Sequence, residues 1–152
     1  MGIIIDSNLS WKQHIDDIIP KLNKVCFAIR SVKPFMPLEV RRFSYFPYFH
    51  SVLFYGIVFW GNSVHSKYIF EIQKRIIRII TNAGIRDSRQ DLFKKLQMLP
   101  FYSQYIYSLL MFAVKNRDLF KLNSDIHGFS KRHDNDFHLP SAKLKLFQEG
   151  VF

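Results

Sequence analysis

Residues 67–83 read KYIFEIQKRIIRIITNA and have the clearest helical periodicity of the chain. When successive residues are turned by about 100° around a helix axis, one side collects Ile69, Ile72, Ile76, Ile77, Ile79 and Ile80. The opposite side collects Lys67, Glu71, Lys74, Arg75 and Arg78. The stretch therefore predicts an amphipathic helix with an isoleucine face turned to a core and a face of net positive charge. Gly84 is expected to end this helix in a left-handed conformation.

Upstream, apolar residues recur at steps of three and four from Trp11 to Ile29 and predict a helix to about Val32. Pro20 lies inside this run and removes one backbone hydrogen bond, so we expect a kink or a division into two helices. Before it, Gly2–Ile5 is short and β-branched and predicts the end of a strand.

A second helix is predicted to start at Pro37 and to run through Ile57, with a bend at Pro47. No Lys, Arg, Asp or Glu occurs from Phe43 to Ser66, a length sufficient to cross a bilayer. However, Tyr and Phe supply much of the apolar character of this window, and these insert less readily than Leu, Ile or Val. A helix buried in a core is the better interpretation, and no membrane is expected as a partner.

Downstream, a short helix through Leu92 and Leu96 and another after Pro100 complete the helical pattern, which fades near Phe120. The predicted fold is mainly α, a bundle of about four to five helices with one short N-terminal β-strand. We expect a strand at 1–6, a helical domain at 7–120, and a polar tail at 121–152 that is irregular or disordered.

The chain has 152 residues and a formal net charge of +10, which suits a polyanionic partner. The charge is concentrated in residues 67–99, which contain eight Lys or Arg and three Asp or Glu. Contact with nucleic-acid phosphates is the functional interpretation of this region, and a solvated helix face is the alternative. The candidate phosphate-binding residues are Lys67, Lys74, Arg75, Arg78, Arg86 and Arg89.

Other residue patterns favour structural roles. The single Cys26 excludes an internal disulfide and indicates a reducing, intracellular compartment, without distinguishing nucleus from cytoplasm. His127, His133 and His138 have spacings that match no common ligand pattern, so neither a metal ion nor another cofactor is predicted. Eight aromatic residues between 45 and 60 are interpreted as core: Tyr45, Phe46, Tyr48, Phe49, Phe54, Tyr55, Phe59 and Trp60.

Several short motifs occur in a fixed order along almost the whole chain. They are Gly2–Asp6, Leu9–Lys12 with His14–Ile15, Tyr55–Gly56, Phe59–Asn62, Gln73–Arg75, Arg78–Thr81, Leu92–Phe93, Leu99–Pro100, Tyr105–Tyr107, Asn123–His127 and Arg132. In this order the chain resembles the reverse transcriptases of non-LTR retrotransposons, of the jockey-like class. The resemblance implies the region after the catalytic palm, with a last palm strand followed by a thumb and a connection.

The resemblance implies a template–primer duplex and the palm domain as partners, with divalent metal ions needed only by the palm. Polymerisation requires clustered carboxylates that hold two metal ions. The family's Ala-Asp-Asp signature is missing here, and the adjacent pair Asp16–Asp17 lies on a predicted helix. The chain is therefore expected to be a fragment that is not catalytic alone. A non-enzymatic helical protein-interaction module and an inactive transposon relic are the alternatives.

Overall fold

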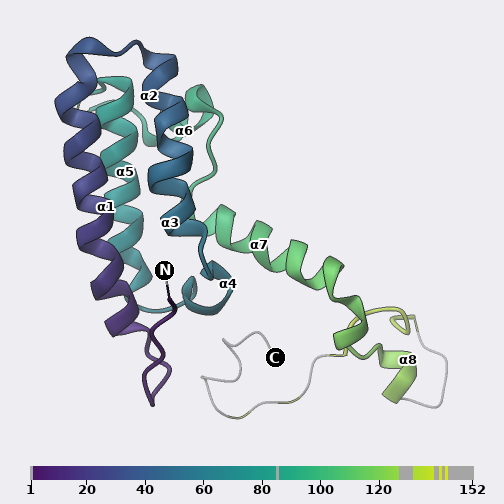
Figure 1. Cartoon of the computed structure of the whole chain (residues 1–152). Coiled ribbons are helices and arrows are strands. Elements are labelled where there is room, and N and C mark those ends of the chain that lie inside the picture. The colour runs from purple at the N-terminus through teal and green to yellow at the C-terminus, as the bar shows by residue number, and fades with distance from the viewer. Residues whose placement is uncertain (1, 85, 127–131, 139–140, 142, 144–152) are drawn as a thin grey trace. The chain divides into compact units, whose positions relative to one another are not determined.

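The computed structural model describes residues 2–84, 86–126, 132–138, 141 and 143. The chain divides into two compact units, Met1–Tyr105 and Ile106–Phe152. The first unit is a bundle of helices, so the prediction of a mainly helical bundle is confirmed (Figure 1). Its elements are α1 (Lys12–Val32), the 3₁₀-helix η1 (Lys33–Phe35), α2 (Leu38–Tyr45), the π-helix η2 (Phe46–His50), α3 (Ser51–Phe54), α4 (Ile57–Trp60), α5 (Ser66–Thr81), α6 (Arg89–Leu96) and the start of α7 (Phe101–Lys115).

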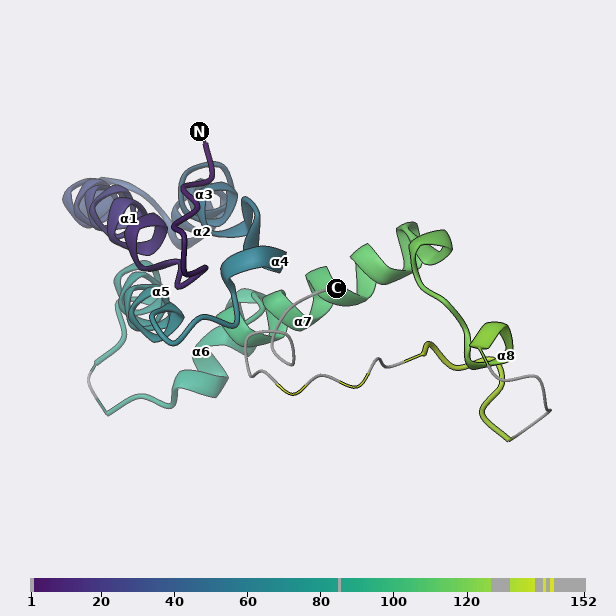
Figure 2. The same cartoon turned by 90° about the horizontal axis from the view of Figure 1, so that it is seen from below.

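Helices α1 and α5 lie side by side and run in the same direction, with the continuous column of α2, η2 and α3 beside them (Figures 1 and 2). Each contributes an apolar face to one core. The predicted isoleucine face of α5 is buried as expected, and α1 adds Ile15, Ile18, Leu22, Cys26 and Ile29. The third column supplies Tyr45, Phe49 and Leu53, while Trp60 of α4 and Phe101 of α7 are fully buried.

One polar side chain, Gln73, lies within the apolar face of α5 and is 1% exposed. Its amide nitrogen donates to the Tyr45 hydroxyl at 3.0 Å and to the Leu99 carbonyl at 3.1 Å. Its amide oxygen accepts the backbone N–H of Phe101 at 2.7 Å. The side chain therefore fixes α5 to α2 and to the segment that joins α6 to α7. Burial also raises the pKa of Tyr45 to about 12, so its hydroxyl stays protonated.

The predicted second helix contains a π-helical turn and ends earlier than expected, at Phe54. Pro47 lacks a backbone N–H, and the chain widens around it into the π-helix, where the Ser51 N–H donates to the Phe46 carbonyl five residues before. The helix then ends at Phe54 because Gly56 has a φ of +64°, and a Cβ there would lie 2.7 Å from Ile3. Thus the backbone turns where the N-terminal segment packs closely against it.

The predicted N-terminal strand is wrong, and of the kink or division predicted at Pro20 the division is excluded. Gly2–Ile5 forms no strand, because no other described segment pairs with it; its hydrogen bond runs from the Ile4 N–H to the His14 imidazole at 3.3 Å. Helix α1 is not divided at Pro20, which lies on the exposed side where water can satisfy the carbonyl left without its N–H partner.

The second unit contains the rest of α7, the 3₁₀-helix η3 (Arg117–Leu119) and α8 (Asn123–Ile126). A single bridge joins Leu122 to Phe137, and the Asn123 and Ser124 N–H groups donate to carbonyls at 136 and 134. The predicted tail is therefore hydrogen-bonded across 121–126 and 132–138, while 127–131, 139–140, 142 and 144–152 lie outside the described residues. Within the described part of the chain, no helix is both long and apolar enough for a membrane span.

Replacing Gln73 by Leu is expected to lower the free energy of unfolding by about 2–4 kcal/mol. The substitution preserves apolar volume but leaves the Phe101 N–H and the Leu99 carbonyl without the amide that satisfies them. Urea unfolding followed by circular dichroism measures the change. Gln13→Leu, at an exposed position of α1, is the matched control and should stay within about 0.5 kcal/mol of the natural chain. Equal effects of the two substitutions would contradict the role given to the Gln73 hydrogen bonds.

Acid should destabilise the first unit through His14, which is 1% exposed. Burial lowers the pKa of this imidazole below its ordinary value of 6.5, although Asp17 opposes the shift. Below about pH 6.5 the unfolded chain therefore binds a proton that the folded chain excludes. The free energy of unfolding decreases as the pH falls through this range. Unfolding measured between about pH 7 and pH 5 should show a smaller pH dependence in His14→Gln. The exposed His133→Gln is the control, and a pH dependence unchanged in His14→Gln would refute this role.

Candidate functional site

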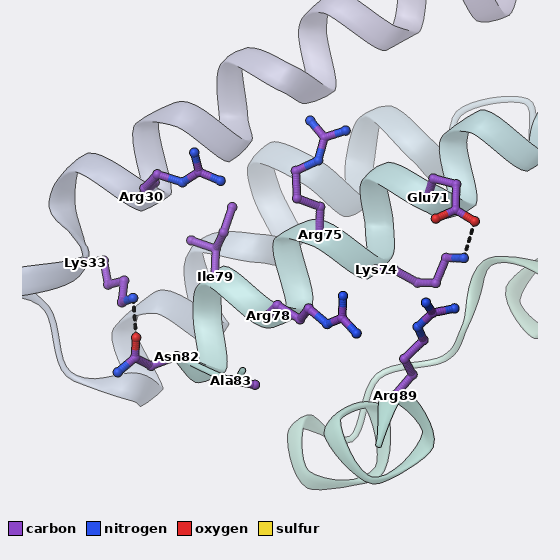
Figure 3. A pocket seen from close by; sticks show the side chains of 10 residues that line it. All are labelled: Arg30, Lys33, Glu71, Lys74, Arg75, Arg78, Ile79, Asn82, Ala83 and Arg89. Carbon is purple, nitrogen blue, oxygen red and sulfur yellow. Dashed lines mark hydrogen bonds and ion pairs between the residues drawn. The ribbon is translucent and has the colours of Figure 1, made fainter. Parts of the chain in front are cut away.

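A hollow of about 480 Å³ opens between the C-terminal halves of α1 and α5 and the start of α6 (Figure 3). Six of its lining residues are cationic and one is a carboxylate. The lining residues are Arg30, Lys33, Glu71, Lys74, Arg75, Arg78, Ile79, Asn82, Ala83 and Arg89. We refer to this site as the basic hollow.

The parallel packing of α1 and α5 builds one wall of the basic hollow. Arg75 donates to the side-chain oxygen of Asn23 at 3.1 Å, in the middle of α1. At the helix ends, the Lys33 ammonium donates to the side-chain oxygen of Asn82. Asn82 can reach it because it ends α5 in a left-handed conformation, with a φ of 58°. Helix α5 therefore ends at Asn82 and not at the predicted Gly84, and the residue that ends it also contacts Lys33, the first residue after α1.

Lys74 is the most enclosed cation of the hollow and is only 9% exposed. Its ammonium donates to the Glu71 carboxylate, one turn earlier on α5, and lies 4.6 Å from the centre of the Phe70 ring. The hydrogen bond from Lys74 lowers the pKa of Glu71, with smaller contributions from Arg89 and Arg78. Glu71 is therefore ionised at neutral pH and offsets one of the surrounding positive charges.

The arginines supply most of the remaining charge. Arg30, Arg75 and Arg89 are exposed and Arg78 is half-buried. In Figure 3 the side chains of Lys74, Arg78 and Arg89 extend toward one another, although Arg89 belongs to α6 and the other two to α5. Guanidinium groups present several N–H donors in one plane, which suits the oxygens of a phosphate. The arrangement can hold an anion that has several oxygens.

Four of the six candidate residues predicted from the sequence line the basic hollow: Lys74, Arg75, Arg78 and Arg89. Lys67 lies in the first turn of α5, with its ammonium 5.2 Å from the centre of the Tyr68 ring. Arg86 is exposed in the segment between α5 and α6. Neither Lys67 nor Arg86 lines the hollow. Sequence reasoning missed Arg30 and Lys33, whose contribution depends on the register between α1 and α5.

The other candidate sites have structural explanations. The Asp17 carboxylate pairs with the Lys21 ammonium at 2.5 Å on α1. His133 contacts Asp136 at 2.8 Å and His138 contacts Asn123 at 3.3 Å, whereas His127 lies outside the described residues. Among the residues that the structure describes, no three of His, Cys, Asp and Glu gather in a group able to hold a metal ion.

The interpretation of the aromatic stretch as core is correct for Tyr45, Phe49 and Trp60 only. The other five members are exposed: Phe46, Tyr48, Phe54, Tyr55 and Phe59. The physical reason is geometric, because a helical column at the edge of a bundle turns only one face toward its neighbours. The exposed rings leave an apolar surface on α2, η2, α3 and α4.

Comparison of this chain with protein-family models, with curated proteins and with solved structures found no match in any of the three.

Cys26 is expected to be unreactive while the chain is folded. It is 4% exposed, and burial raises the pKa of its thiol from 9.0 to about 11, although Arg75 and Arg30 oppose the shift. At neutral pH the thiolate fraction falls by about a hundredfold. Labelling with a chromogenic disulfide reagent should be slow in native buffer and rapid in denaturant. Ser103→Cys, at an exposed position of α7, provides a positive control. Rapid stoichiometric labelling of folded Cys26 would contradict its assignment as a buried apolar group.

Proposed function

We propose that this chain is a helical nucleic-acid-binding unit that holds the phosphate backbone in the basic hollow. The observation that supports the proposal is the convergence of six cationic side chains, from α1, η1, α5 and α6, around one carboxylate. Fixed positive charge of this kind binds a polyanion without reading its sequence, because phosphates repeat along every strand.

The resemblance to non-LTR retrotransposon reverse transcriptases gives this proposal a specific form. In that form the chain is a thumb-like region that contacts the template–primer duplex, and a separate palm domain carries the metal ions and performs nucleotidyl transfer. In that form this chain binds the duplex and the palm domain catalyses the reaction. The predicted motifs Gln73–Arg75 and Arg78–Thr81 lie on α5, which provides the centre of the basic hollow.

A helical protein-interaction module is the second candidate function. It is favoured by the exposed apolar side chains that follow one another along α2, η2, α3 and α4, among them Phe43, Tyr48 and Phe59. Exposed apolar surface of this extent is typical of a contact with another protein or domain. Under the first proposal the palm domain would cover it, and under the second another protein would do so. An inactive relic of a transposable element would retain the basic hollow without a biological role for it.

Replacing Arg78 and Arg89 together by Gln is expected to weaken binding to a labelled duplex. The slope of log affinity against log salt concentration should decrease by roughly 0.9 for each phosphate contact that is lost. Glu71→Gln should have the opposite effect and raise the affinity about two- to threefold, because it removes the carboxylate of the hollow. Fluorescence anisotropy over a series of salt concentrations measures both quantities.

The matched control is Lys12→Gln, which removes one exposed positive charge at the start of α1. Lys12 and Arg30 are 18 residues apart on the same helix, about 27 Å along its axis. This control should leave the affinity nearly unchanged at moderate salt. The comparison is made per charge removed, because the double variant removes two charges and Lys12→Gln removes one. If each lost charge weakens binding equally in the two variants, the charge is diffuse and the basic hollow is not the binding site.

A further inference from the structure

A second hollow, of about 550 Å³, is lined by α5, α6 and the stretch that leads into α7, and it adjoins the basic hollow at Arg89. Its walls are mainly apolar and its rim is polar. The apolar walls come from Phe70, Phe93, Met98, Leu99 and Pro100, and the rim from Arg89, Gln90, Lys94 and Gln97. We refer to this site as the apolar hollow.

The two hollows share a boundary. Arg89 lines both of them. Lys74 lines the basic hollow, and its ammonium lies 4.6 Å from the centre of the Phe70 ring, which lines the apolar hollow. A ligand that has an apolar part next to an anionic part can therefore place each part in the matching hollow.

The apolar hollow is held open by contacts that belong to the fold. Gln73 binds the Leu99 carbonyl, and the Arg42 side chain donates to the Leu96 carbonyl at 2.7 Å. Phe70 packs edge-on against Tyr102, with ring centres 5.2 Å apart. Leu99 nevertheless remains 47% exposed, so an apolar side chain stands at the edge of the hollow without covering it.

We infer that the apolar hollow accepts an unpaired base of a single-stranded nucleic acid whose phosphates lie in the basic hollow. This inference rests on the proposed function and specifies its ligand. A base has apolar faces that pack against aromatic and aliphatic side chains, and its edge has donors and acceptors that amides such as those of Gln90 and Gln97 can pair with. Bases inside a duplex are stacked on each other, so only an unpaired nucleotide can enter. An acyl chain would match the apolar walls but not the amide rim.

The test compares three labelled ligands by fluorescence anisotropy: a blunt duplex, the same duplex with a single-stranded overhang, and that duplex with an abasic overhang. The abasic overhang keeps the phosphates and lacks the bases. We expect the overhang with bases to bind about tenfold more tightly than the abasic one. Phe70→Leu loses the aromatic ring, so it should abolish the difference between the two overhangs. Because Phe70 also contacts Lys74 of the basic hollow, the affinity of this variant for the blunt duplex is measured beside it as the reference.

Leu99→Ala provides a second variant in case Phe70→Leu impairs folding, because the exposed Leu99 side chain can be shortened at little cost. It should reduce the preference for bases, whereas Leu110→Ala, at an exposed position of α7, should not. Equal affinity for the two overhangs, with the blunt duplex still bound in a salt-dependent way, would overturn this inference and leave the proposed function standing. Failure to bind any of the three ligands would overturn both. Equal overhang affinities together with Phe70-dependent binding to anionic phospholipid vesicles would assign the apolar hollow to a lipid.

Discussion

The buried amide of Gln73 is the constraint on which the arrangement of the first unit depends. An amide enclosed by isoleucines costs free energy unless its donors and acceptor are paired, and its partners belong to two other parts of the chain, α2 and the stretch that leads from α6 into α7. Satisfying it fixes Tyr45 of α2 and the backbone at Leu99 and Phe101 relative to α5. The chain leading from α6 into α7 is thereby held against α5, and this places Arg89 opposite Lys74 and Arg78. The α6 side of the basic hollow thus depends on a hydrogen-bonding requirement in the core, whereas the packing of α1 against α5 builds its other wall.

The parts of the fold that could be predicted from the sequence are those set by local periodicity. The isoleucine face of α5 and the apolar face of α1 follow from spacings of three and four residues, and both are buried as expected. The errors arise where the outcome depends on distant partners. Gly2–Ile5 has the composition of a strand but no described strand beside it, and Pro20 lies where solvent makes its missing hydrogen bond tolerable. The turn at Gly56 has a φ of +64° and leaves no space for a Cβ beside Ile3, which is distant in the sequence.

In the candidate site, too, residues set by local periodicity could be predicted and residues set by distant partners could not. Lys74, Arg75 and Arg78 could be placed together because they share a face of one helix, and Arg89 follows within a short distance along the chain. Lys67 lies on the same face of α5 when the helix is viewed along its axis, but it is at the other end of the helix. A shared face therefore does not by itself predict that Lys67 lies near the other three residues. Arg30 and Lys33 carry no distinguishing signal in the sequence, because their role arises only when α1 and α5 run in parallel with Asn82 beside Lys33.

Hydrogen bonds within the protein hold three cations of the basic hollow, and this affects which anions the hollow can select. Lys33, Lys74 and Arg75 are each held by one acceptor, respectively Asn82, Glu71 and Asn23. Long side chains of this kind ordinarily lose about 0.5–1.5 kcal/mol of rotamer entropy each when a ligand immobilises them. Here much of that freedom is already lost on folding, so these three cations form a preorganised array rather than a set of mobile charges. Such an array favours anions whose spacing matches its own, and a flexible polyanion must adapt its geometry to the protein.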